Sequence, residues 1–119
     1  MTARVATLGV LILLAALTGG TTAAQAPPGQ IEEHVVLNND SVRIVLITYP
    51  PGADSDLHLN LGPEITVVQG GALTLYAQGR REVLGAGAAH WLPDGTAHLA
   101  RNEGTLPVRF WSLLLKRCD

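Results

Sequence analysis

Short runs of β-branched and other apolar residues, most of them separated by turns rich in glycine or proline, constrain the fold of this chain more than any other feature. Runs of this kind cover residues 33–37, 41–48, 56–61, 64–69, 72–78, 81–84, 88–92, 96–102 and 108–115. The sequence holds 13 glycines and 7 prolines, which supply the backbone angles that tight reversals need. Strands spaced about eight to twelve residues apart predict an all-β sandwich or barrel.

The first 24 residues have a different character. Arg4 is followed by a largely apolar stretch over residues 8–17 and then by small residues ending at Ala24, which is typical of a secretory signal peptide. An uncleaved anchor is the alternative, but the apolar stretch is much shorter than the roughly 20 residues that span a bilayer as a helix. We expect a signal peptide over 1–24, a linker over 25–31 and one domain over 32–119.

Export and composition limit the partners of this domain. The expected product is periplasmic or secreted, with no stable membrane insertion after cleavage. The chain is 47% hydrophobic and 15% charged, as in a globular fold, and its net charge of −2 argues against a nucleic acid partner. The single cysteine, Cys118, cannot form an internal disulfide, so packing, a metal or a partner subunit must stabilise the domain.

Two glycine-bounded segments place histidines and one glutamate at strand spacing beside turns. In the segment 52–71, His58 and Asn60 are two residues apart and would face the same side of a strand. Glu64 follows a Gly-Pro turn, opens the next run and can face the same space. The second segment, 87–102, delivers His98 just after a Pro-Asp-Gly turn.

Together these segments resemble the two motifs of the cupin superfamily, Gly-x5-His-x-His-x3,4-Glu-x6-Gly and Gly-x5-Pro-x-Gly-x2-His-x3-Asn. Nine of the ten marked positions agree in order and spacing: Gly52, His58, Glu64, Gly71, Gly87, Pro93, Gly95, His98 and Asn102. The tenth position holds Asn60, where the family usually has a histidine. The chain is therefore similar to a small one-domain bacterial cupin.

This resemblance implies a single jelly-roll β-barrel in which His58, Glu64 and His98 point inward as metal ligands. Asn60 would be a weak or water-bridged fourth ligand, since its amide oxygen is neutral and harder than an imidazole nitrogen. Two histidines and one carboxylate are the ligands of a facial triad, so Fe(II) is the favoured divalent metal, with Mn, Ni, Zn and Cu as alternatives. A homodimer is also expected, because one-domain cupins commonly pair and residues 42–47 are apolar on nearly both strand faces.

The expected function is that of an exported metal-binding cupin with a small organic ligand. It would be a metal-dependent, dioxygenase-like enzyme or, alternatively, a non-catalytic module that binds or senses a small molecule or metal. Tyr76 is the candidate substrate-binding residue, since its hydroxyl could donate a hydrogen bond into the pocket. A metal-free isomerase would need His58 or His98 to form an acid–base pair with Tyr76. His90 is interpreted as a packed or surface residue.

Overall fold

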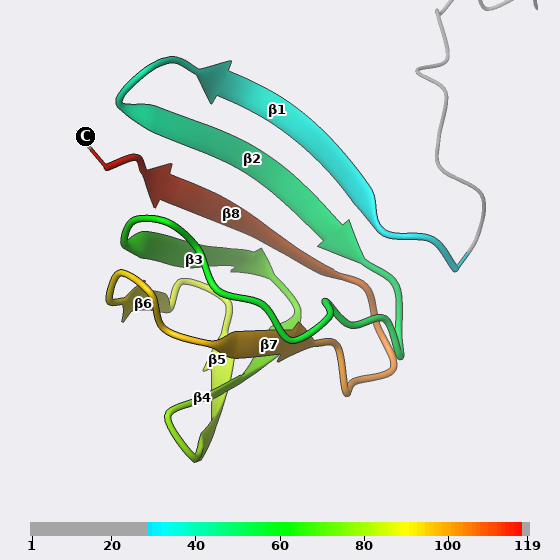
Figure 1. Cartoon of the computed structure of the whole chain (residues 1–119). Helices are drawn as coiled ribbons and strands as arrows, with labels where there is room; N and C mark the ends of the chain where they lie inside the picture. Colours follow the sequence, from blue (N-terminus) through cyan, green and yellow to red (C-terminus); the bar gives the residue numbers. More distant parts are fainter. Residues whose placement is uncertain (1–28, 118–119) are drawn as a thin grey trace, which may run out of the picture.

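The computed structural model describes residues 29–117, and all of its regular structure is β, as predicted. The strands are β1 (Glu32–Asn38), β2 (Val42–Tyr49), β3 (Glu64–Gly70), β4 (Ala72–Ala77), β5 (Arg80–Gly85), β6 (Ala89–Leu92), β7 (His98–Arg101) and β8 (Val108–Leu115). They form a five-stranded sheet in the order β1-β2-β8-β3-β6 and a three-stranded sheet in the order β5-β4-β7 (Figure 1). The predicted signal peptide and Cys118 lie outside the described residues. Residues 29–117 contain no helix long and apolar enough to cross a membrane.

The two sheets enclose the interior, and β1 and β2 extend beyond the three-stranded sheet at one end (Figure 1). Every strand pair in both sheets is antiparallel. Side chains directly opposite one another in such pairs share a face, so the register defines rows across the sheet. One inward-facing row runs from Ile47 in β2 through Phe110 in β8 to Val68 in β3. These alternating inward positions form the core.

The prediction of a strand over residues 56–61 is wrong. This segment runs beside β7 with two isolated bridges, Asp54 with Arg101 and His58 with His98. Four residue steps on one side therefore oppose three on the other, which breaks a regular ladder. The segment is held by separate backbone hydrogen bonds, including Ser55 N to Ala100 O at 2.8 Å.

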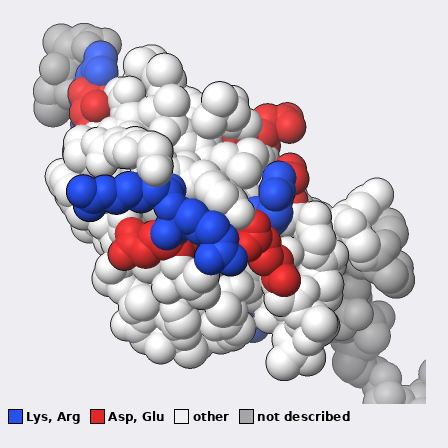
Figure 2. Space-filling view, turned by 90° about the horizontal axis from the view of Figure 1, so that it is seen from below, with Lys and Arg blue, Asp and Glu red and all other residues white. Residues whose placement is uncertain are grey.

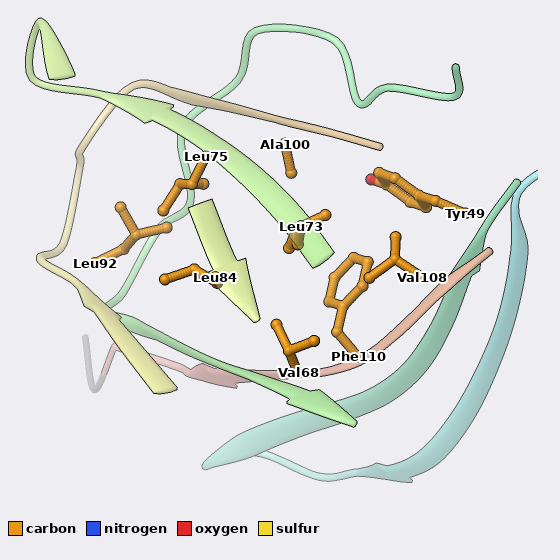
Figure 3. Packing of buried hydrophobic residues seen from close by; sticks show 9 residues of the cluster. All are labelled: Tyr49, Val68, Leu73, Leu75, Leu84, Leu92, Ala100, Val108 and Phe110. Carbon is orange, nitrogen blue, oxygen red and sulfur yellow. The ribbon is translucent and has the colours of Figure 1, made fainter. Parts of the chain in front are cut away.

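The hydrophobic core lies between the two sheets (Figure 3). Its buried members are Tyr49, Val68, Leu73, Leu75, Leu84, Leu92, Ala100, Val108 and Phe110. Tyr49 and Phe110 meet edge to face, with ring centroids 5.1 Å apart. Leu73 and Leu75 are nearly inaccessible, at 1% and 3% exposed, and face the five-stranded sheet from β4. The core therefore fills the barrel interior on one side of the candidate site.

Tyr49 brings a phenol into this core. Burial raises its pKa from 10.0 to about 12, with a partial offset from a hydrogen bond to Ser55. Burial acts in this direction because a low-dielectric interior disfavours the phenolate. The neutral hydroxyl is therefore the form that the folded chain stabilises.

Asn102 joins the end of β7 to the end of β2. Its side chain is 1% exposed, and its amide nitrogen donates to the carbonyls of Tyr49 at 3.0 Å and Leu106 at 2.8 Å. Its amide oxygen accepts from the Gly104 backbone nitrogen at 3.0 Å. Both donor hydrogens and the acceptor are used, which is what burial of an amide requires.

Gly62 is the most tightly enclosed glycine before β3, and its replacement gives a test of this packing. It has φ +125°, and an added Cβ would overlap the carbonyl oxygen of Leu115. We expect Gly62→Ala to lower the free energy of unfolding by about 3 kcal/mol or more. Gly79→Ala is the matched control, because Gly79 has φ +71° with no atom within 4 Å of the added Cβ, and it should cost about 1 kcal/mol. Urea denaturation gives both values, and equal losses would contradict the prediction.

The raised pKa of Tyr49 predicts how stability changes at alkaline pH. The folded-state pKa of Tyr49 is above the unfolded value. The contribution of the neutral phenol to the free energy of unfolding is therefore intact below pH 10 and is lost as the pH rises towards about 12. Tyr49→Phe should therefore show a shallower fall in unfolding free energy across this range than the wild type. Denaturant titrations at matched pH values measure the difference. Parallel curves for the two proteins would show that Tyr49 ionises alike in both states.

Candidate functional site

A cavity of about 180 Å³ lies inside the barrel between the two sheets. His58, Asn60, Glu64 and His98, the four predicted ligand residues, all line it. They come from the irregular segment before β3, from the first residue of β3 and from the first residue of β7. The structure thus brings the two motifs to one cavity wall.

Backbone pairing fixes the two histidines side by side. The His58 nitrogen donates to the His98 carbonyl at 3.0 Å, and the His98 nitrogen donates to the His58 carbonyl at 2.8 Å. Their imidazole centroids are 4.2 Å apart, with an interplanar angle of 57°. His98 is 3% exposed, whereas His58 lies at the exposed side of the cavity.

Each of these imidazoles is oriented by a carbonyl two residues earlier in the chain. His58 Nδ1 lies 2.6 Å from the Asp56 carbonyl oxygen, and His98 Nδ1 lies 2.9 Å from that of Thr96. A carbonyl can only accept, so Nδ1 must carry the hydrogen in both rings. The neutral form of each ring then has its lone pair on Nε2.

The carboxylate of Glu64 is held by two side-chain donors. Asn60 Nδ2 donates to Oε2 at 2.5 Å, and Thr66 Oγ1 donates to Oε1 at 3.3 Å. Asn60 therefore contacts the Glu64 carboxylate through its amide nitrogen and not through its amide oxygen. Among residues 29–117, no three His, Cys, Asp or Glu side chains are arranged closely enough to hold a metal ion.

The Pro-Asp-Gly turn of the second motif holds the loop of the first. Asp94 Oδ1 accepts from the Gly62 nitrogen at 2.8 Å, and the Gly95 nitrogen donates to the Asn60 carbonyl at 3.2 Å. Arg117 pairs with Asp94, with Nε 2.5 Å from Oδ2. This hydrogen bond, with a weaker one from Gly62, lowers the pKa of Asp94. The turn thus fixes the position of Asn60 and the start of β3.

The structure does not bring Tyr76 into this cavity. Its hydroxyl donates to Glu103, and Arg81 Nη2 binds the same carboxylate at 2.6 Å. These two partners, Tyr76 first, lower the pKa of Glu103. Arg101 lies 5.8 Å from the centre of the Tyr76 ring. Figure 2 shows basic and acidic side chains meeting in a band on the side of the molecule that it presents.

The remaining histidines lie apart from the cavity. His90 is partly buried on β6, and its Nε2 is 3.0 Å from Glu82 Oε2 beside a second cavity of about 180 Å³. His34 is exposed on β1. Neither lines the cavity that holds His58 and His98.

Among the titratable residues that line the cavity, sequence reasoning missed three, Glu33, Arg43 and Tyr49. Arg43 is the one with a usable signal. It is a lone cation in the apolar run of β2 and has the same parity as Val45 and Ile47, which face inward. That parity could have placed its side chain inside the barrel.

Comparison with known proteins identifies the fold. A family model described as "Cupin domain" matches residues 45–115, more than half of the chain. A cupin superfamily protein from Desulfitobacterium hafniense superposes with a TM-score of 0.73 at 15% identity, over 79% of this chain and 84% of that one. KdgF from Halomonas sp. gives 0.69 at 24% identity, over 81% and 86%. An uncharacterized conserved protein with a double-stranded β-helix domain from Klebsiella pneumoniae gives 0.67 at 25%, over 76% and 81%.

A curated protein also aligns with this chain. Endoribonuclease YbeY of Myxococcus xanthus is 31% identical over 87 residues, which are 71% of this chain and 30% of that protein. The chain thus spans less than a third of that relative, whose activity is stated for the whole protein. The family model and the shared jelly-roll barrel establish that this chain belongs to the cupin family.

Proposed function

We propose that this cupin binds a divalent metal ion through His58, Glu64 and His98, with Fe(II) favoured over Mn, Ni, Zn and Cu. The observation that carries the proposal is the orientation of the two imidazoles. A carbonyl oxygen accepts from Nδ1 in each ring, so Nε2 is left as the donor atom for a metal. Metal-bound histidines in proteins commonly use this arrangement. A carboxylate in the same cavity would complete a two-histidine, one-carboxylate donor set. The three side chains would have to move closer together around the ion than they lie in this structure.

Asn60 would act mainly through Glu64. Its amide nitrogen bonds the carboxylate at 2.5 Å, so it orients the charged ligand and has its oxygen left for a water or a weak contact. A metal held by three protein ligands keeps coordination positions for a small molecule. When bound, such an ion supplies Lewis acidity and, in the case of iron, reactivity towards dioxygen.

A metal-dependent oxygenase is one function for such a site, and a non-catalytic binding or sensing module is the alternative. The acid–base groups lining the cavity favour the alternative. Besides the proposed ligands, the described lining includes the acids Glu33 and Tyr49. Glu33 is exposed on β1, and the raised pKa of Tyr49 keeps its phenol neutral, so neither is a ready base.

We also propose that two copies pair through the outer face of the five-stranded sheet, and that the chain is exported. The outer positions of four adjacent strands carry Ile44, Leu46, Trp111, Leu113, Ile65, Val67 and Trp91. Trp91 is 53% exposed. These seven residues are uncharged, so a second copy of the same face is complementary to it, whereas a charged partner is not.

Replacing each proposed histidine ligand tests the metal site. Wild-type protein loaded with Fe(II) or Mn(II) should hold about one ion per chain, and His58→Ala and His98→Ala should each weaken binding at least about 100-fold. Elemental analysis after dialysis measures the content. His90→Ala is the matched control and should retain the ion. Metal content that survives both ligand changes would show that the site is elsewhere.

Oxygen uptake separates the enzyme from the binding module. Metal-loaded protein mixed with a panel of small phenols and thiols should consume oxygen if it is an oxygenase, and the consumption should vanish in His98→Ala. An oxygen electrode gives the rate. Tight binding of a panel member without uptake would favour the binding module.

Two exposed apolar residues on different sheets test the dimer. Trp91→Glu should convert a dimer to a monomer, because it buries a charge in the proposed interface. Val83→Glu is the control, since Val83 is 54% exposed on β5 in the other sheet. Sedimentation velocity reports the mass of each. A wild-type monomer, or a Trp91→Glu dimer, would refute the interface.

A further inference from the structure

The cavity wall contains a cation that the proposed metal site does not use. Arg43 lies on the inward row of β2 and is partly buried. Within residues 29–117 no carboxylate forms an ion pair with it. Asn38, its partner across β1, has its amide oxygen engaged by Lys116 Nζ at 2.7 Å. A guanidinium directed into a barrel without an acidic partner is unusual, because burying a charge costs free energy unless it is paired.

Register places Arg43 in line with the candidate site. Arg43 in β2 is directly opposite Leu114 in β8, and Leu114 is directly opposite Glu64 in β3. All three line the same cavity. Two strand spacings separate Arg43 from Glu64, so their Cα atoms lie roughly 10 Å apart across the sheet. The cavity therefore has the donor set at one end and a guanidinium on the adjoining wall, with the apolar side chain of Leu114 between them.

We propose that Arg43 binds the carboxylate of a small organic acid whose other end reaches His58, Glu64 and His98. The guanidinium fork matches a carboxylate in bidentate geometry, and such charge-assisted pairs are among the stronger polar contacts. The role of the other end rests on the proposed metal site. The cavity is about 180 Å³, below the roughly 300 Å³ of common small-molecule pockets, so the acid must be small.

The charges around the cavity favour a carboxylate over a phosphate. Glu33 and Glu64 line the same cavity as Arg43, and His58 and His98 are its other titratable side chains besides Tyr49. Two acidic groups near one arginine repel a dianion more than a monoanion. A single negative charge on the ligand therefore suits this wall better.

Matched acid and amide probes test the proposal. Calorimetric titrations with succinamate, which carries one carboxylate, and with the neutral diamide succinamide should give wild-type protein a Kd at least about tenfold lower for succinamate. Arg43→Gln should lose this preference, whereas Arg43→Lys should keep part of it because it retains the charge without the fork. Arg80→Gln is the matched control, since Arg80 is exposed on β5 in the other sheet and does not line the cavity, and it should bind as the wild type does.

The titrations are run on metal-loaded and metal-free protein, with metal content and thermal unfolding measured on each sample. A preference for succinamate that depends on Arg43 in metal-free protein would support the carboxylate site even if the chain holds no metal. A folded Arg43→Gln variant that binds metal and still prefers succinamate would overturn it while leaving the metal site intact. Wild-type protein without any preference for succinamate would overturn it as well.

Discussion

The buried amide of Asn102 is the contact on which the arrangement of the site depends. Its side chain ties the end of β7 to the end of β2, and its backbone pairs with Gly52 and Ala53 at 2.9 Å each. Each buried backbone group left without a hydrogen-bond partner would cost about 1–3 kcal/mol. Asn102 satisfies several such groups at once, so their stability depends on this one residue. The chain that leaves β2 must therefore start its path beside β7. The segment carrying His58 follows from that start.

Because this segment lies beside β7 without a regular ladder, its side chains are positioned by single hydrogen bonds. His58 and His98 exchange both backbone hydrogen bonds, and the turn at Asp94 holds the loop at Gly62. An irregular segment leaves room for side chains that a fully paired strand would bring closer together. The cavity thus lies where the barrel changes from core packing to a polar wall, with Leu73, Leu75 and Phe110 forming its apolar side.

Sequence patterns predicted most of the fold and the composition of the site, for identifiable reasons. Turn residues and composition locate β2, β3, β4 and β8, because each is an apolar or β-branched run with glycine or proline next to at least one end. Motif spacing placed His58, Glu64 and His98 at one cavity. Spacing alone does not say which face of its strand a residue occupies, so Tyr76 was assigned to the pocket although its hydroxyl binds Glu103 outside it. Which face a side chain occupies depends on pairing between segments that are distant in sequence. The same pairing explains why residues 56–61 form an isolated bridge to β7 and not the expected strand.

Asn60, at the motif position where cupins usually have a histidine, and Arg43, the unpaired cation of the cavity wall, can be considered together. A histidine at position 60 would add an imidazole metal ligand. The amide of Asn60 instead uses its nitrogen to donate a hydrogen bond to Glu64, and it adds no charge. A site with fewer protein donors depends more on its small-molecule ligand to complete the coordination of a metal. Arg43, in line with Glu64 through Leu114, can hold the far end of such a ligand. Under the two proposals, Asn60 and Arg43 would therefore act together, because binding of an organic acid by the guanidinium would compensate for a metal site with fewer protein ligands.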